Sequence, residues 1–167
     1  MTVRDHTMAK AKSPRMSSAP RSAEVPVDLE QQLCFAVYST MLAFNKVYRV
    51  LLGSLDLTYP QYLVMLALWQ GDGVTVSDIG DRLSLDSSTL TPLLKRLEAA
   101  GLVARQRAEG DERRVVVTLT PAGRRLRSSA KDIPGRLAQM IGAPVEEIVA
   151  LRCQLEAVRG ALLRGVA

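Results

Sequence analysis

The run from Val74 to Leu119 changes its hydrophobic period, and this change constrains the fold more than any other feature. Apolar side chains first recur at helical spacing, at Val76, Ile79 and Leu83. A second helical segment follows a short polar break, and alternation replaces the helical period after Gly101. Two helices joined by a tight turn and followed by two strands are typical of a winged helix-turn-helix. We therefore expect a mostly α fold with a small β wing.

The second helix of this run has one apolar and one polar face. Leu90, Leu93, Leu94 and Leu97 form its predicted buried stripe, and Asp86 is a good N-cap acceptor. Hydroxyl and cationic side chains on the opposite face suit contacts with phosphates and base edges, so this helix is expected in the major groove of double-stranded DNA. The predicted contact residues are Ser87, Ser88, Thr89, Thr91, Pro92, Lys95 and Arg96.

The alternating segment predicts two strands, at 102–107 and 115–119, joined by a turn over 108–112. One interpretation is a solvated, charged hairpin of an ordinary domain. Its attachment to a helix-turn-helix pattern favours a wing that contacts DNA. The wing residues expected at DNA are Arg105, Arg107, Asp111, Arg113 and Arg114.

The positive charge is concentrated where DNA contact is expected. The formal net charge is +5, and residues 95–127 carry nine basic against four acidic side chains. Residues 1–26 are rich in Ser, Ala and Pro and carry five Lys or Arg, which predicts a disordered basic tail. The folded domain is expected over residues 27–167, with the winged helix-turn-helix at about 60–120.

Several classes of protein are disfavoured by composition. No apolar run approaches the about 20 residues of a membrane span, and the N-terminus has no secretory apolar segment. Cys34 and Cys153 are far apart and make neither a disulfide framework nor a zinc pattern, and the single histidine is His6. We therefore expect a cytoplasmic protein with no metal and no cofactor.

The segments that flank the winged unit are long and apolar. The pattern predicts one helix over 29–52, one from Pro121 towards Ile141, and a last helix from Pro144. The helix after Tyr59 is apolar nearly all round, which is typical of a buried helix. We expect the helices at about 28–53 and 121–165 to interlock in a homodimer that binds a palindromic operator. The alternative is a monomer whose terminal helices pack on the same core.

The order of these elements resembles the MarR family of dimeric winged-helix regulators, and the wing sequence DERR resembles that family's wing signature. Four segments, LEQQLCFAVYS, LDLTYPQYLVMLALW, LDSSTLTPLLKRLE and KDIP, resemble its organic hydroperoxide-responsive repressors (OhrR). The resemblance implies a repressor of a peroxide-detoxifying gene, with organic hydroperoxide as inducer. It also implies that Cys34 is the sensing thiol and that Tyr48 and Tyr59 donate hydrogen bonds to it.

The sequence around Cys34 can also be interpreted without the resemblance. Cys34 lies at a predicted helix start, where the helix dipole favours a thiolate. Cys34 and Tyr48 would lie about 21 Å apart on one straight helix, so their contact requires the partner subunit. The alternative is an inert core thiol, since cysteine is among the most buried residue types. Tyr38, one turn after Cys34, lines the same pocket or packs in the core.

The second cysteine has two interpretations. Some members of the subgroup form an intersubunit disulfide with a resolving cysteine, which would fall near 136–141, where this chain has none. We expect Cys153 to be a buried structural thiol in the last helix, with the resolving role as the alternative. Oxidised Cys34 would then form a mixed disulfide with a low-molecular-weight thiol or oxidise further.

Two other functions compete with redox-controlled repression. One is a MarR-type repressor induced by a small aromatic ligand bound near the 59–69 segment. The other is a thiol peroxidase that uses Cys34, which the absence of a C-x-x-C reductant motif in the sequence disfavours. We therefore do not expect an enzyme.

Overall fold

A computed structural model of the chain describes residues 27–108 and 110–166, without the side chains of residues 111–113. The predicted basic tail, residues 1–26, lies outside the described residues. The chain divides into two compact units, Met1–Val37 and Tyr38–Ala167.

The described part of the first unit holds a short helical turn, η1 (Leu29–Gln31), and the start of α1 (Leu33–Leu51). The single helix predicted over 29–52 is therefore wrong, because Gln32 has an extended backbone. The side-chain amide of Gln31 donates to the Asp28 carboxylate at 3.3 Å, and that of Gln32 donates to the Asp28 carbonyl at the same distance. These local bonds stabilise η1 as a separate turn.

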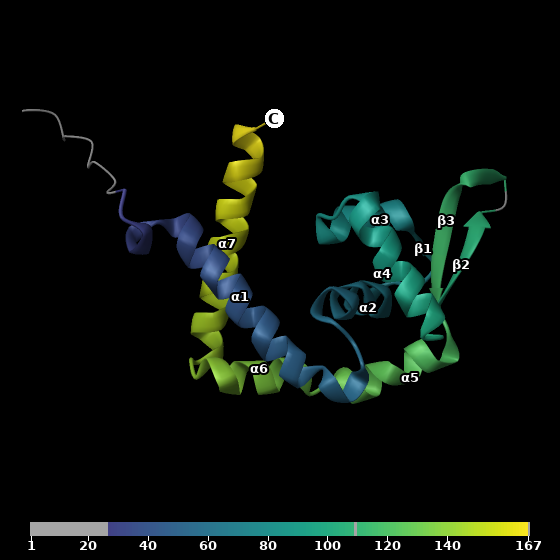
Figure 1. Ribbon diagram of the computed structural model, residues 1–167, viewed down its shortest axis with the longest axis horizontal. Helices are drawn as coiled ribbons and strands as arrows, with labels where there is room; N and C mark the ends of the chain where they lie inside the picture. The colour runs from purple at the N-terminus through teal and green to yellow at the C-terminus, as the bar shows by residue number, and fades with distance from the viewer. Residues whose placement is uncertain (1–26, 109, 167) are drawn as a thin grey trace, which may run out of the picture. The chain divides into compact units, whose positions relative to one another are not determined.

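The second unit is mostly helical and carries one small sheet, which confirms the predicted winged helix-turn-helix (Figure 1). No helix among the described residues is long and apolar enough to cross a bilayer. After α1 the elements are η2 (Gly53–Leu55), α2 (Tyr59–Gln70), β1 (Val74–Thr75), α3 (Val76–Leu83), α4 (Ser87–Ala99), β2 (Val103–Ala108), β3 (Asp111–Leu119), α5 (Pro121–Ala130), α6 (Ile133–Ile141) and α7 (Val145–Gly165).

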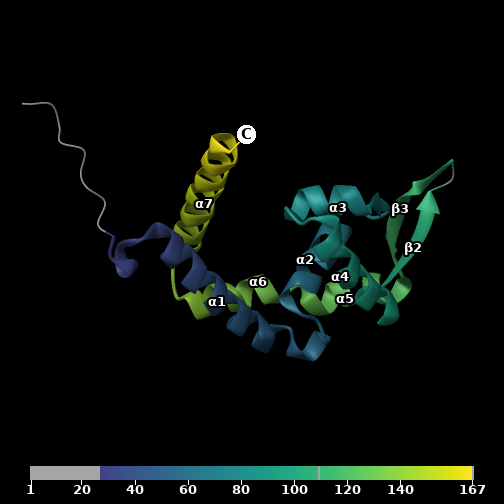
Figure 2. The same ribbon diagram turned by 45° about the horizontal axis from the view of Figure 1, so that its top comes forward.

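Helix α2 forms the centre of the core, as its apolar composition predicted. Tyr62, Val64, Met65 and Leu68 are all at most 2% exposed, and α3, α4 and α5 all pack against this helix. Both views show α3 and α4 beside α2 (Figures 1 and 2). Burying such side chains contributes about 1.5–3 kcal/mol each.

Helix α4 is bounded as the sequence predicted. The Asp86 carboxylate accepts a hydrogen bond from the Thr89 amide at 2.8 Å, which confirms the N-cap. At the other end Gly101 has φ +69°, a conformation that favours glycine and ends the helix. Leu90, Leu94 and Leu97 are fully buried, but Leu93 is only half-buried, so the buried stripe is narrower than expected.

The sheet is antiparallel in the order β1-β3-β2. The strand β1 was missed, because two residues are too short to show alternation; Val74 pairs with Val117. The predicted turn over 108–112 is too long, since Ala108 pairs with Asp111 and the strands continue to positions 108 and 111. The β2–β3 hairpin extends beside α3 and α4 in both views (Figures 1 and 2).

The single helix predicted from Pro121 towards Ile141 is wrong. It is divided into α5 and α6, with a break at residues 131–132. Pro134 explains the break, because its ring lacks an amide donor and clashes with the carbonyl four residues earlier, which belongs to Ala130. Ala130 is accordingly the last residue of α5, and Pro134 lies in the first turn of α6.

Replacement of Gly123 tests a close approach of two backbone segments in the second unit. A Cβ on Gly123 would lie 2.1 Å from the Leu102 carbonyl oxygen, whereas a Cβ on Gly135 would meet nothing within 4 Å. We expect Gly123→Ala to lower the free energy of unfolding by about 2 kcal/mol or more, because backbone must move. The control Gly135→Ala should be neutral or stabilising by up to about 1 kcal/mol. Urea unfolding of both variants measures this, and equal stabilities would contradict the packing.

Candidate nucleic-acid interface and thiol site

The polar face of α4 is exposed and internally ordered. Hydroxyls of Ser88 and Thr89 both donate to the Asp86 carboxylate, and the Thr91 hydroxyl donates to the Ser87 carbonyl at 2.7 Å. These bonds, those from Ser88 first, hold the pKa of Asp86 below its usual range, so the cap persists into acid solution. Of the predicted contact residues on α4, Thr91 is half-buried and the others are exposed: Ser87, Ser88, Thr89, Pro92, Lys95 and Arg96.

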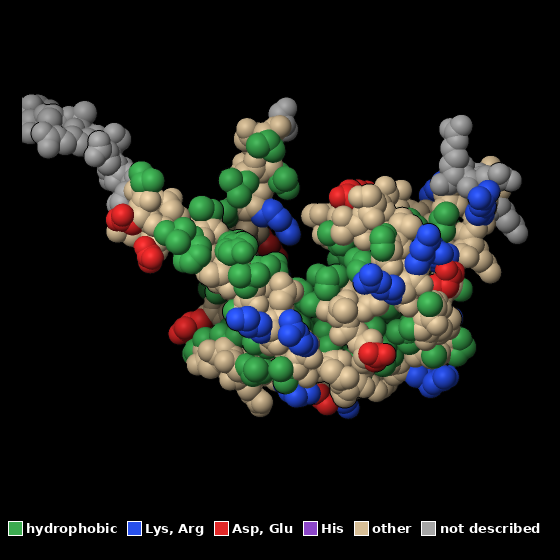
Figure 3. All heavy atoms as spheres, in the orientation of Figure 1, with side chains coloured by type: hydrophobic (Ala, Val, Ile, Leu, Met, Phe, Trp, Pro, Cys, Tyr) green, Lys and Arg blue, Asp and Glu red, His purple; other side chains and the backbone are tan. Residues whose placement is uncertain are grey.

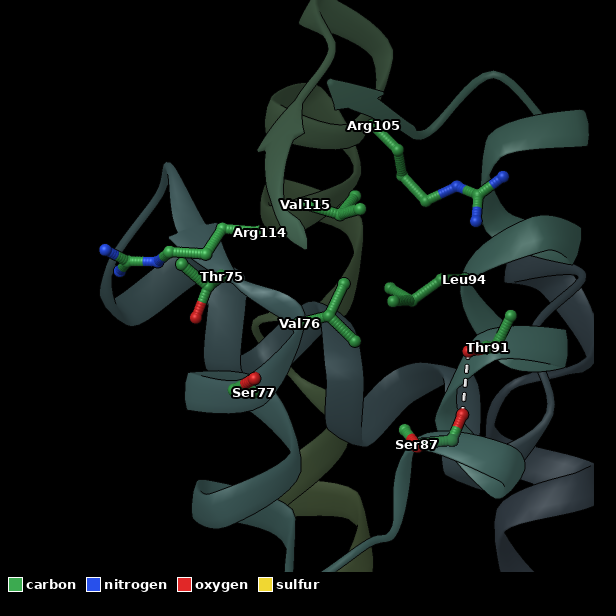
Figure 4. Close-up of a pocket in the computed structure, with 9 residues that line it drawn as sticks. All are labelled: Thr75, Val76, Ser77, Ser87, Thr91, Leu94, Arg105, Arg114 and Val115. Atoms are coloured by element: carbon green, nitrogen blue, oxygen red, sulfur yellow. Dashed lines mark hydrogen bonds between the residues drawn. The ribbon is translucent and has the colours of Figure 1, made fainter. Parts of the chain in front are cut away.

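A hollow of about 280 Å³ lies between the starts of α3 and α4 and the strands of the wing. Val76, Leu94 and Val115 form part of its apolar lining, and hydroxyls and two arginines supply its polar groups (Figure 4). Basic side chains also gather over the exposed surface of α4 and the hairpin (Figure 3). This surface combines donors and positive charge, as contact with phosphates requires. The polar residues around the hollow are Thr75, Ser77, Ser87, Thr91, Arg105 and Arg114.

The wing arginines are placed differently from one another. Arg107 and Arg114 are exposed. Arg105 is half-buried and forms an ion pair with Glu98 on α4 at 2.6 Å. The side chains of Asp111 and Arg113 lie outside the described residues, so their predicted contacts remain predictions.

Asp72 is a structural position near the base of the wing that the sequence analysis missed. One of its carboxylate oxygens accepts from the amides of Leu119, at 2.7 Å, and Gly73, at 2.9 Å. The other oxygen accepts from Arg124 on α5. Asp72 thus joins the end of α2, the end of β3 and the start of α5, which positions the base of the wing. The only local signal was the Asp-Gly pair, which indicates a turn.

The two tyrosines implied by the resemblance lie together. The rings of Tyr48 and Tyr59 stack with centroids 4.1 Å apart, and Tyr62 lies 5.8 Å from Tyr48. Tyr62 in turn meets Trp69 edge to face. Burial, and then the neighbouring Tyr59 and Tyr62, raise the pKa of Tyr48 to about 12, so its phenol is a neutral donor at neutral pH. Tyr38 is 61% exposed and does not pack in a core.

Both cysteine thiols are exposed in the single chain. Cys34 occupies the first turn of α1 and belongs to the first unit, whereas Tyr48 and Tyr59 belong to the second. The expectation that Cys153 is buried is wrong for the single chain, because α7 has no buried residue. Arg152 approaches the Cys153 sulfur at 3.9 Å. Among the described residues, no group of three His, Cys, Asp or Glu side chains could hold a metal ion.

Comparison with known proteins places the chain among transcriptional regulators. The SarA/Rot transcriptional regulator family matches residues 46–129. The HTH-type regulator TtmR of Methylorubrum extorquens is 50% identical over 137 residues, 82% of this chain and 70% of TtmR. The organic hydroperoxide resistance transcriptional regulator of Bacillus subtilis is 45% identical over 127 residues, 76% of this chain and 86% of that protein. The chain belongs to the MarR/SarA family of winged-helix transcriptional regulators.

Solved structures agree with this assignment. The structure of AbfR of Staphylococcus epidermidis is 37% identical, with a TM-score of 0.69, and the match covers 81% of this chain and 94% of AbfR. Reduced AbfR bound to DNA matches at 36% identity, a TM-score of 0.69 and the same coverage of both chains. The predicted class, a DNA-binding transcriptional regulator rather than an enzyme, is confirmed by the family.

The raised pKa of Tyr48 predicts a loss of stability in alkaline solution. A phenol whose pKa is raised on folding contributes stability that is complete below about pH 10 and declines as the pH rises towards 12. Tyr48→Phe cannot ionise there, so its free energy of unfolding should fall less than that of wild type over this range. Urea unfolding at pH 9 and pH 11.5 measures the difference. The exposed control Tyr38→Phe should follow wild type, and a Tyr48→Phe curve parallel to wild type would contradict the burial.

Proposed function

We propose that this chain is a homodimeric repressor that releases operator DNA when an organic hydroperoxide oxidises Cys34. The observation that carries the proposal is the exposed Cys34 thiol in the first turn of α1. It occurs in a chain 45% identical to an organic hydroperoxide resistance regulator. Related structures describe AbfR as reduced on DNA and as disulfide-formed, which supports thiol oxidation in this group. Overoxidised AbfR is also described on DNA, so the proposed release is assigned to the sulfenic acid and the mixed disulfide.

The proposed chemistry is a two-electron oxidation of sulfur. The Cys34 thiolate attacks one peroxide oxygen, an S–O bond forms, and the O–O bond breaks. The departing alkoxide takes up a proton and leaves as the alcohol, and the sulfur becomes a sulfenic acid. A low-molecular-weight thiol can then condense with the sulfenic acid to give a mixed disulfide and water.

The phenols of Tyr48 and Tyr59 are the proposed hydrogen-bond donors to that sulfur. Helix α1 runs from Leu33 to Leu51. At 1.5 Å per residue, about 21 Å of helix separates Cys34 from Tyr48, so the proposal places these phenols in the partner subunit. Oxidation then changes an interface between two copies, and with it the spacing of the two α4 helices.

A second copy of the chain is the proposed partner for the apolar faces of α1 and α7. Large apolar side chains remain exposed along both helices (Figure 3). Exposed apolar surface of this extent marks an interaction site in a soluble protein. A dimer would present two α4 helices to a palindromic duplex. The exposed residues include Leu33, Val37, Met41, Leu42, Val145, Val149, Leu151, Leu155 and Leu162.

Oxidation by cumene hydroperoxide tests the proposal. The probe is a duplex of about 30 base pairs, long enough for two half-sites, enriched from a random library by the reduced protein. We expect oxidised wild type to bind this duplex at least about tenfold more weakly than reduced wild type, with recovery in dithiothreitol unless the sulfur has oxidised beyond sulfenic acid. Reduced Cys34→Ser should bind normally and stay bound after treatment.

Cys153→Ser is the matched control. It should respond to the peroxide as wild type does, and non-reducing gels of treated wild type should show no covalent dimer. Unchanged affinity of oxidised wild type would refute the redox mechanism. A covalent dimer that Cys153→Ser abolishes would make Cys153 a resolving cysteine.

A further inference from the structure

One wing arginine is tied to the DNA-reading helix by three hydrogen bonds. Arg105 donates to the Glu98 carboxylate through Nε at 2.9 Å, through Nη2 at 2.6 Å and through its backbone amide at 3.2 Å. The Arg105 side chain is 24% exposed and the Glu98 side chain is 36% exposed. The same contact holds the pKa of Glu98 below its usual range. A planar guanidinium bound in this way is fixed in orientation.

Strand pairing connects this ion pair to all three strands of the sheet. Arg105 pairs with Val117 of β3, and Val117 pairs on its other side with Val74 of β1. Glu98 lies in the last turn of α4, and its backbone carbonyl accepts from the Gly101 amide at 2.9 Å. The ion pair therefore bridges the turn between α4 and β2 and joins the centre of the sheet to the end of the helix.

The second arginine of the hollow is arranged differently. Figure 4 shows Arg105 extending towards α4 and Arg114 extending the opposite way, past Thr75. Arg114 is exposed and interacts with the Asp78 carboxylate only through its charge, whereas Arg105 forms a close ion pair with Glu98. Arg105 therefore adds little net charge to the DNA-facing surface, although the sequence analysis expected it to contact DNA.

We propose that Glu98 and Arg105 are positioning residues, which set the angle of the wing relative to α4 and so determine specificity for DNA. The proposal rests on DNA binding by this face and not on the redox chemistry, since every measurement uses reduced protein. It predicts that an acidic residue beside the DNA interface favours binding, although its charge alone would repel phosphates.

The double variant Glu98→Gln/Arg105→Gln tests the proposal, because it has the same net charge as wild type. Affinity is measured for the enriched duplex and for a random-sequence duplex over a range of salt concentrations. We expect the double variant and Glu98→Gln each to bind the enriched duplex about tenfold more weakly. This is the loss expected when a misplaced wing gives up one charge-assisted hydrogen bond to DNA. Affinity for the random duplex should stay within about twofold, and the salt dependence of the double variant should match wild type.

The control Arg114→Gln should weaken binding to both duplexes and reduce the salt slope by about 0.9 per protomer, which is about 1.8 for the dimer. A thermal unfolding midpoint well above the assay temperature would show that each variant is folded in the binding assay. Partial unfolding would instead lower the affinity for both duplexes alike. Wild-type affinity of the double variant for the enriched duplex, or tighter binding by Glu98→Gln, would overturn the proposal. If wild type itself fails to enrich any duplex, the proposed function fails instead.

Discussion

The position of the wing depends on one close approach, where α5 passes the turn that follows α4. Gly123 lies so near the Leu102 carbonyl that no larger residue fits without movement of the backbone. Its own carbonyl accepts a hydrogen bond from the Trp69 indole at 2.9 Å. The Thr120 hydroxyl donates to the Gly101 carbonyl at 2.6 Å beside them. This junction fixes the ends of α2, α4 and β3 together, and so joins the base of the wing to the helix that we propose to contact DNA.

Further polar contacts extend this junction on both sides. Hydrogen bonds to Asp72 link the loop after α2 to the end of β3 and to α5. Hydrogen bonds to Glu98 link α4 to the middle of β2. Aromatic contacts connect Trp69, through Tyr62, with the stacked pair Tyr48 and Tyr59. The proposed sensing tyrosines thus share a continuous packed core with the base of the wing. These contacts are a physical route by which a change at the tyrosines could reach the proposed DNA-facing surface.

Sequence periodicity predicted the elements whose burial is one-sided or complete, such as α4 with Leu90, Leu94 and Leu97. The Asp86 cap could also be predicted, because capping depends on residues within one turn. The break before α6 was missed although Pro134 is visible in the sequence, since the pattern of apolar residues continues through it. The Glu98–Arg105 pair and the Asp72 contacts could not be found, because they join residues across turns whose geometry no periodic pattern encodes. The stacking of Tyr48 on Tyr59 was not predicted, because the resemblance implied only that both phenols donate to Cys34.

The central claim is that the state of one thiol decides whether the DNA-reading surface stays on DNA. The most direct test measures, in the same samples, the fraction of Cys34 oxidised by mass spectrometry and the fraction of the enriched duplex that remains bound. Cumene hydroperoxide is added in steps up to about one equivalent per protomer, the stoichiometry of sulfenic acid formation. The account predicts that release follows Cys34 oxidation throughout the titration. DNA that remains bound by protein whose Cys34 is fully converted to sulfenic acid, or DNA released while Cys34 is still reduced, would contradict it.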